Sequence, residues 1–311
     1  MYLGCDNMNE KLSILERFGE NLSAKEYITN PAIARDEEIK KTILTLLTPE
    51  RSAILTGKPG IGKTALVEGI AWRIQNGDVP EALKNYQVIK LNTGSLVGEE
   101  VTGTTIENRL QLLVDELAEL ENIIIFIDEI HMLMNATTKG NLDFANMLKP
   151  TLSRGKVKAI GATTSDEYER YILRDKAFVR RFEKIEMAEP TEAQTIAIVL
   201  GTIPKMEKTA GIPVGFNEYI AEQIIESIVE ATTEYKRIFE NESRYPDVAL
   251  SLFSKGFSQA LFHNRDKVKI QDFLEAIEQY EGIYPDVRIK EATKFKEKFK
   301  KELEKENIEK L

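Results

Sequence analysis

Cysteine, histidine and membrane-length apolar runs are all scarce in this sequence of 311 residues. The single cysteine, Cys5, cannot form a disulfide within the chain, and one cysteine with two histidines offers little for a site that binds a soft metal ion. The longest clear apolar run, 123–127, is far shorter than the ~20 residues needed to cross a bilayer. We therefore expect a cytoplasmic protein with no membrane partner.

Glycine and proline are also few, at 18 and 10 residues, which excludes collagen-like and low-complexity chains. Hydrophobic residues make up 42% of the chain, and a protein of about 300 residues can bury roughly three quarters of its unfolded surface. The formal net charge of -9 argues against non-specific attraction to nucleic acid or to anionic lipid. These features predict a compact fold with no nucleic-acid partner.

Short apolar runs alternate with helical patterns between about residues 33 and 187, which is typical of a mostly parallel sheet flanked by helices. Helices are expected at 63–75, 106–120 and 166–174, the last of them capped by Ser165. Strands are expected at five runs rich in β-branched residues: 53–56, 88–91, 123–127, 157–161 and 184–187. The sequence thus predicts an α/β class fold for this region.

Beyond Pro190 the strand pattern disappears, and a helical period of 3.6 residues runs through 191–201, 217–229, 246–263 and 270–280. We expect an amino-terminal extension at 1–32, an α/β core at 33–190, a small all-helical lid at 191–285 and a charged helix at 286–311. In the last segment the apolar residues Phe295, Phe299 and Leu303 recur every four positions. A solvated helix with one thin apolar edge is favoured there over a dedicated interaction tail.

The segment 57–64 reads Gly-Lys-Pro-Gly-Ile-Gly-Lys-Thr and fits the phosphate-binding pattern G-x-x-x-x-G-K-[ST] between a predicted strand and a predicted helix. Glycines let successive backbone N–H groups point inward at an anion, and the start of the following helix adds its positive dipole end. Lys63 is expected to reach the β- and γ-phosphates of ATP, and the Thr64 hydroxyl to bind Mg²⁺. The nucleotide-binding residues are therefore predicted to be Gly57, Lys58, Pro59, Gly60, Ile61, Gly62, Lys63, Thr64 and Ala65.

Two acidic residues, Asp128 and Glu129, follow the apolar run 123–127 directly. Burying a carboxylate costs free energy unless the group is paired, hydrogen-bonded or bound to a metal ion, so two acids at the end of a buried strand suggest a function. Asp128 is expected to bind the nucleotide through the Mg²⁺ shell, and Glu129 to orient and deprotonate the attacking water. A strand that simply emerges into solvent remains the alternative for this pair taken alone.

Four further segments carry a family resemblance: 76–81 (Asn-Gly-Asp-Val-Pro-Glu), 126–131, 146–150 (Asn-Met-Leu-Lys-Pro) and 161–168. With the phosphate loop they resemble the first ATPase domain of the Clp unfoldases and disaggregases of the AAA+ superfamily, from about residue 15 to 190 and more weakly through 245–247. The resemblance implies a P-loop NTPase fold with a helical lid, ATP hydrolysis and a protein-remodelling function.

The same resemblance implies roles for residues outside the two motifs. Thr164 falls at the family's sensor position beside the acids, and Arg180 and Arg181 fall where the family places arginine fingers that reach the neighbouring subunit's nucleotide. Ile33 and Ala34 fall in the segment that lies against adenine. Hydrolysis would then depend on a homo-oligomeric ring, for which the family implies six subunits.

One loop departs from the family pattern. Members that thread polypeptides carry an aromatic residue before the helix that corresponds to 106–120, whereas residues 98–105 read Gly-Glu-Glu-Val-Thr-Gly-Thr-Thr. Aromatic faces supply the large contact area that grips an extended chain. No segment resembles the substrate domain, the coiled-coil insertion or the second ATPase domain of the larger members, so partnership with a Clp peptidase is not supported.

These observations favour a Clp-type AAA+ ATPase that couples hydrolysis to the remodelling of a protein partner. The alternative is a nucleotide-dependent regulatory or adaptor subunit with little threading activity, for which the loop 99–105 is the motivation. A nucleic-acid motor such as a helicase loader is a third hypothesis, which the acidic net charge opposes.

Overall fold

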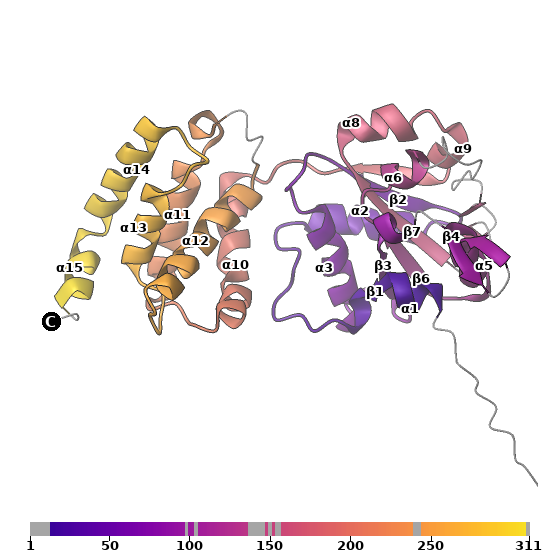
Figure 1. The fold of residues 1–311 in the computed structure, drawn as a ribbon, viewed down its shortest axis with the longest axis horizontal. Helices are drawn as coiled ribbons and strands as arrows, with labels where there is room; N and C mark the ends of the chain where they lie inside the picture. Colours follow the sequence, from indigo (N-terminus) through magenta and orange to yellow (C-terminus); the bar gives the residue numbers. More distant parts are fainter. Residues whose placement is uncertain are drawn as a thin grey trace, which may run out of the picture. The chain divides into compact units, whose positions relative to one another are not determined.

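The computed structural model describes residues 13–96, 99–102, 105–135, 147–148, 151–152, 157–238 and 244–308. The described residues form two compact units (Figure 1). The first unit holds the chain up to Lys25 together with Lys41–Thr56 and Arg73–Ile185, and the second holds Glu26–Lys40, Gly57–Trp72 and the chain from Glu186 onward. The expected domain boundaries at 32, 190 and 285 stay a prediction.

The first unit is built on a sheet of six strands in the order β1-β3-β6-β7-β2-β8. Neighbours β3, β6, β7 and β2 pair in parallel, and β1 pairs antiparallel with β3 at the edge. The mostly parallel sheet predicted from the sequence is thereby confirmed. The strands are β1 (Gly19–Asn21), β2 (Ser52–Thr56), β3 (Gln87–Leu91), β6 (Ile123–Ile127), β7 (Val157–Thr163) and β8 (Phe182–Glu186).

The middle of this sheet explains why the central strands read as unbroken apolar runs. Every residue of β2, β6 and β7 is buried, as expected for parallel strands that are covered on both faces. In register, Ile127 of β6 lies beside Gly161 of β7, and Thr163 of β7 lies beside Thr56 of β2. The carboxyl ends of three strands therefore meet at one edge of the sheet.

Short helices and one hairpin complete the first unit. Strands β4 (Glu99–Thr102) and β5 (Thr105–Asn108) pair antiparallel. The core of the unit gathers apolar residues of α1, α5 and α6 against the sheet strands. The helices are α1 (Ile14–Phe18), α4 (Thr93–Leu96), α5 (Arg109–Glu119), α6 (His131–Asn135), α8 (Ser165–Glu167), a π-helix (Tyr168–Ile172) and α9 (Lys176–Val179), while α2 (Asp36–Leu47) and α3 (Lys63–Gln75) have residues in both units.

Two expected helices of the first unit are corrected by the structure. Residues 105–108 form strand β5, so the helix expected from Ile106 begins only at Arg109, where the Asn108 side chain caps it. The helix expected at 166–174 begins at Ser165, is capped by Thr164, and continues as a π-helix from Tyr168. The observed caps, Asn108 and Thr164, set the starts of these helices.

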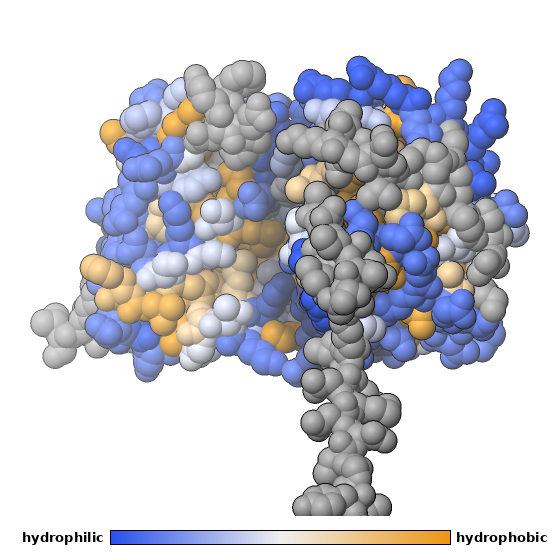
Figure 2. All heavy atoms as spheres, turned by 45° about the vertical axis from the view of Figure 1, so that its right-hand side comes forward, coloured by the Kyte–Doolittle hydropathy of each residue, from blue (hydrophilic) through white to orange (hydrophobic). Residues whose placement is uncertain are grey.

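In the described residues from Glu192 onward, the second unit is helical apart from isolated β-bridges, and its helices form a bundle (Figure 1). Buried residues of every long helix share one core. Apolar side chains also stay exposed, such as Phe262 and Ile289, and Figure 2 shows apolar residues (orange) among hydrophilic ones (blue) on one face. The helices are α10 (Glu192–Ala210), α11 (Glu218–Ala231), α12 (Asp247–Phe262), α13 (Ile270–Glu278), α14 (Pro285–Lys298) and α15 (Lys300–Ile308).

The charged terminal segment packs into this bundle as two helices that meet at Phe299. The apolar edge expected to face solvent is buried, because Phe295, Phe299 and Leu303 are 2%, 2% and 6% exposed within the shared core. Glu306 accepts hydrogen bonds from the first backbone N–H groups of α13 at 2.9 and 3.2 Å. The segment is therefore neither a solvated helix nor a free tail but a structural part of the helical unit.

Candidate functional site

The loop that follows β2 carries three glycines with positive φ: Gly57 at 152°, Gly60 at 75° and Gly62 at 97°. Such backbone conformations favour glycine, since a side chain there is strained. At Gly57 a Cβ atom would also lie 2.6 Å from the backbone oxygen of Met187. The loop therefore needs glycine for its shape, as a phosphate-binding turn does.

Lys63 is enclosed by this loop. Its side chain is almost fully buried, and its Nζ donates hydrogen bonds to the backbone oxygens of Gly57 at 2.9 Å and Lys58 at 3.0 Å. α3 begins at the same residue and runs for 13 residues. A buried ammonium group beside a helix amino terminus fits a phosphate anion, since both attract negative charge.

Arg35 links this loop to two other stretches of the second unit. The guanidinium group is buried and donates to the oxygen of Ile61 at 2.7 Å and to the oxygen of Ala188 at 3.0 Å. It also pairs with Glu38 one helical turn later at 2.9 Å. Arg35 therefore fixes segment 33–35 against the phosphate loop.

The predicted base contacts Ile33 and Ala34 lie in the segment that Arg35 fixes. A Cβ atom on Gly201 of α10 would collide with the Ile33 side chain, so the two residues are in close contact. Ala34 has a positive φ of 57°, which turns the chain sharply before α2. The structure thus brings the predicted adenine segment and the phosphate loop together, while the base contact itself stays a prediction.

The turn 245–247 also reaches the phosphate loop. Asp247 begins α12 after the cis peptide bond between Tyr245 and Pro246. Its Cβ lies 3.0 Å from where a Cβ on Gly60 would be. Asp247 is therefore a residue of the candidate site that pattern matching did not assign.

Glu189 holds the same turn in place. One carboxylate oxygen accepts from the backbone N–H of Tyr245 at 2.7 Å and from Arg237 at 3.0 Å, and the other lies 3.9 Å from Arg244 Nε. Arg237 also stacks over the Tyr245 ring at 4.2 Å from its centroid. Glu189 thus joins Tyr245, Arg237 and Arg244 around the turn.

In the first unit, Asp128 follows the carboxyl end of β6. Its carboxylate lies 3.6 Å from Lys90 Nζ, and its side chain is 26% exposed. Carboxylate oxygens suit a hard cation such as Mg²⁺. Asp128 can therefore serve the metal role predicted for it.

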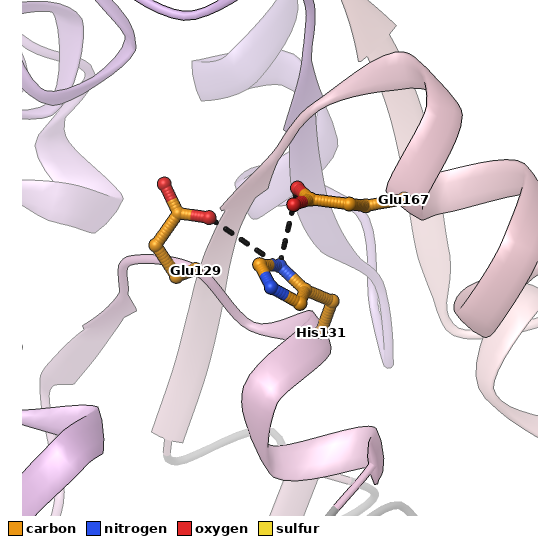
Figure 3. A group of neighbouring side chains, drawn as sticks. All are labelled: Glu129, His131 and Glu167. Atoms are coloured by element: carbon orange, nitrogen blue, oxygen red, sulfur yellow. Dashed lines mark ion pairs between the residues drawn. The ribbon is translucent and has the colours of Figure 1, made fainter.

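Glu129, His131 and Glu167 form a cluster beside Asp128 (Figure 3). His131 Nδ1 lies 3.3 Å from a Glu129 oxygen and 3.2 Å from a Glu167 oxygen. Glu129 has a positive φ of 51°, an uncommon conformation for a residue with a side chain. Within the described residues, these three also bring ligand atoms within 4.8 Å of one another, close enough to share a metal ion.

Thr163 and Thr164 make different contacts at the end of β7, and the sensor role expected for Thr164 stays a prediction. Thr163 is fully buried at the end of β7, and its hydroxyl donates to Glu167 at 2.9 Å and lies 3.1 Å from His131 Nδ1. The Thr164 hydroxyl instead accepts from the backbone N–H of Glu167 and caps α8. The threonine hydroxyl that meets the cluster therefore belongs to Thr163.

The cluster also shifts the pKa of Glu167. Partial burial alone would raise this pKa, but hydrogen bonds from the Thr164 backbone and from the side chains of Thr164 and Thr163, together with the charge of nearby His131, lower it. Glu167 is therefore held as a carboxylate that accepts hydrogen bonds.

Arg180 and Arg181 lie at the other end of the sheet. The backbone oxygen of Arg181 accepts from the N–H of Ser52 at the start of β2, whereas Thr163 lies beside Thr56 at the end of β2. A strand of this length spans about 13 Å, at roughly 3.3 Å per residue. Arg180 is exposed, and Arg181 is partly buried. Within the first unit, the two arginines are thus kept apart from Asp128 and Glu129.

The loop in which the family carries an aromatic residue corresponds to the β4–β5 hairpin. Strand pairing covers 99–102 and 105–108, while 98, 103 and 104 lie outside the described residues, as do 146, 149 and 150 of the Asn-Met-Leu-Lys-Pro segment. The hairpin contains no aromatic residue, as the sequence already indicated.

Sequence reasoning missed Arg35, Asp247, His131, Thr163 and Glu167 as members of the candidate site. Arg35 follows Ile33 and Ala34, and Asp247 lies within the segment 245–247 of the weaker resemblance, so their position was the available clue. His131 and Glu167 lie within segments that carry the family resemblance, but no role was predicted for either residue. Their meeting depends on the pairing of β6 with β7, which no local pattern reveals.

The described fold agrees with that of known proteins. The family described as "ATPase family associated with various cellular activities (AAA)" matches residues 53–188. This chain carries an AAA ATPase domain. It is similar to the chaperone protein ClpB of Aquifex aeolicus, with 40% identity over 78% of this chain and 23% of that protein, and to ClpB of Vibrio cholerae, with 36% identity over 86% of this chain and 31% of that protein.

Solved structures give the same relationship for the AAA domain. A cryo-EM reconstruction of Hsp104 with ATPγS and casein superposes with a TM-score of 0.71 at 35% identity, covering 86% of this chain and 45% of that one. The Saccharomyces cerevisiae Hsp104–ADP complex gives 0.68 at 35% identity, over 85% and 45%. The chain spans less than a third of the two ClpB proteins and under half of the Hsp104 chains.

Throughout the part of the chain that the structure describes, no helix is both long enough and apolar enough to cross a bilayer.

Proposed function

We propose that this chain binds ATP and Mg²⁺, hydrolyses ATP between subunits of a ring, and uses the reaction to remodel a protein partner. The observation that carries the proposal is the enclosure of Lys63 by a loop of three positive-φ glycines inside an AAA ATPase domain. The relatives named ClpB are chaperones, and one Hsp104 structure contains casein, which supports a protein as the substrate.

Each residue then has a defined task. The loop 57–65 holds the phosphates with its backbone N–H groups, which every residue but Pro59 has, and Lys63 neutralises their charge. Thr64 and Asp128 supply oxygen ligands for Mg²⁺, which stabilises the charge on the phosphates. Glu129 orients the attacking water and accepts its proton.

The ring is supported by the place of Arg180 and Arg181. They lie at the end of the sheet away from Asp128 and Glu129 of the same unit, as expected for residues that serve a neighbouring subunit's nucleotide. An arginine finger contributes roughly 10³ to 10⁵ in turnover. A homo-oligomer, with six subunits as in the family, would then be the active form.

ATP turnover measured against protein concentration tests this proposal. Specific activity should rise with concentration as subunits assemble, and Arg180→Ala or Arg181→Ala should abolish most of it while leaving ATP binding intact. Glu129→Gln should retain ATP and lose turnover. A flat specific activity, or full activity in both arginine variants, would contradict the ring.

A second candidate function rests on the hairpin sequence 99–105, which carries no aromatic residue to grip a polypeptide. In this case ATP would switch the conformation of a regulatory or adaptor subunit that does little threading. An unfolding assay on a tagged model protein separates the two candidates, since a motor unfolds the protein at the expense of ATP and a switch does not.

A further inference from the structure

His131 stands in the candidate site without a role in the proposed hydrolysis. It is the first residue of α6, two positions after Glu129, and its side chain is only 15% exposed. The ring stacks on Tyr171 with centroids 6.0 Å apart and an interplanar angle of 23°. Packing therefore fixes the ring plane, and Nδ1 points at the oxygens of Glu129 and Glu167 (Figure 3).

The surroundings of Nδ1 determine which atom carries the hydrogen. Three oxygens lie around it: Glu129 at 3.3 Å, Glu167 at 3.2 Å and the Thr163 hydroxyl at 3.1 Å. Thr163 already gives its own hydrogen to Glu167, so toward His131 it can only accept. A lone pair on Nδ1 would face oxygen lone pairs alone. Nδ1 is therefore a donor, with the Thr163 hydroxyl as its hydrogen-bond partner and the Glu129 and Glu167 oxygens at ion-pair distance.

Glu167 is itself held firmly, which makes it an anchor for the ring. One of its carboxylate oxygens accepts from the Thr164 backbone N–H at 3.0 Å and from the Thr163 hydroxyl at 2.9 Å. The backbone N–H of Glu167 in turn donates to the Thr164 hydroxyl, which closes a capping box. The end of β7 thus fixes Glu167, and Glu167 with Tyr171 fixes His131.

Glu129 is the member of the cluster that needs support. Its side chain is 48% exposed, so it could otherwise adopt several rotamers in water. Its backbone is held in the left-handed region, with the next residue, Ile130, donating to the oxygen of Ala162 at 3.0 Å and Met132 donating to the oxygen of Glu129 at 2.9 Å. The backbone is therefore fixed, and one contact of the carboxylate is with His131 Nδ1 at 3.3 Å.

We propose that His131 is a positioning residue that holds the Glu129 carboxylate for hydrolysis through its Nδ1–H, with Glu167 and Thr163 holding His131. The inference rests on the proposed function. In the reaction, the water oxygen bonds to the γ-phosphorus, the bond to the β–γ bridging oxygen breaks, and the water proton goes to Glu129. A carboxylate displaced by about 1 Å can lower such a rate by about 10²-fold.

Paired substitutions separate hydrogen bonding from packing. His131→Asn keeps an N–H donor near the position of Nδ1 but loses the ring, whereas His131→Phe keeps the ring on Tyr171 but loses the donor. We expect His131→Phe to lower kcat by roughly 10- to 100-fold with KM and ATP affinity unchanged, and His131→Asn to retain most of the turnover. A purely structural ring would give the opposite order and would overturn the proposal.

The other histidine supplies a matched control. His263 lies in the helical unit and pairs with Glu275 at 2.8 Å, so His263→Asn makes the same chemical change away from the cluster. It should leave turnover unchanged. A His131→Phe variant that is as active as His263→Asn, or faster than the unmodified protein, would contradict a positioning role.

A spectroscopic test does not depend on activity. The chain has two histidines, so in the His263→Asn protein labelled with ¹⁵N-histidine the only labelled imidazole is that of His131. We expect the ¹⁵N shifts of a ring with hydrogen on Nδ1 and a change in that signal on Glu129→Gln. Hydrogen on Nε2 alone would refute the inference. Absence of ATP binding and turnover in the unmodified protein would instead refute the proposed function.

Discussion

The Glu167 carboxylate of the first unit should make the stability of the protein depend on pH. The folded pKa of Glu167 is lowered from its ordinary value of 4.5, because the hydrogen bonds from Thr163 and Thr164 outweigh the effect of burial. A lowered folded pKa gives stability that is fully present above the ordinary pKa and is lost as the pH falls through the folded pKa. Glu167 should therefore stabilise the protein at neutral pH.

We predict that Glu167→Gln lowers the free energy of unfolding at pH 7, and that this difference shrinks as the pH falls below 4.5. Urea unfolding followed by circular dichroism across this range provides the measurement. Glu169→Gln, an exposed neighbour, is the control and should show little difference at any pH. A Glu167 effect that stays constant or grows toward acid pH would be inconsistent with the hydrogen bonds described.

Arg35 is a second residue whose substitution is expected to affect stability strongly. Its buried guanidinium group joins Ile61, Ala188 and Glu38, and hydrogen bonds to charged groups contribute about 1.5–3 kcal/mol each. Arg35→Gln should therefore lower the free energy of unfolding by at least about 1.5–3 kcal/mol and weaken ATP binding, because it loosens the phosphate loop. Unfolding and calorimetry measure the two effects, and Lys40→Ala on α2, the helix that follows Arg35, should change neither.

Among the structural elements, the terminal helices α14 and α15 are the best test of packing. Phe299 joins them, is 2% exposed, and lies with its ring 4.6 Å from that of Phe295. Lys236 and Glu291, both nearly buried, pair at 3.0 Å and attach α14 to the helical unit. These contacts make the charged segment part of the core.

We predict that Phe299→Ala destabilises the helical unit by about 3–5 kcal/mol, the usual cost of removing a buried aromatic ring. Ile289→Ala on α14 is the matched control, because Ile289 is 68% exposed and should cost little. Urea unfolding of both variants gives the comparison. Equal stability of the two variants would mean that the terminal helices do not share the core.

Elements differ in how far the sequence alone predicts them. The central strands β2, β6 and β7 are short apolar runs, and α3 follows a recognisable glycine loop, so local patterns sufficed. Strand β1 depends on pairing with β3, and the burial of Phe295 and Phe299 depends on distant helices. Contacts between residues far apart in the chain decide these features, and the local periodicity of apolar residues cannot predict such contacts.

The candidate site shows the same division. The glycine loop and Asp128–Glu129 were predicted because the residues that define each motif are adjacent in the sequence. Thr163 was not assigned to the site, since only the folded structure shows that its hydroxyl lies beside His131. The adenine contacts, the Mg²⁺ ligands and the arginine fingers stay predictions.

For the molecule as a whole, ATP binding is the first requirement of the proposed function. The AAA ATPase domain, the enclosed Lys63 and the adjoining segment fixed by Arg35 all point to one nucleotide site per chain. Ring assembly, turnover and any work on a protein partner depend on that site. Without nucleotide binding, none of these proposals would have a basis.

Isothermal calorimetry with ATP and Mg²⁺ tests this claim most directly. The protein should bind one ATP per chain, Lys63→Ala should weaken binding at least about tenfold, and Lys84→Ala, a change at an exposed lysine, should bind like the unmodified protein. Absence of binding by the unmodified protein, or unchanged binding by Lys63→Ala, would contradict the account.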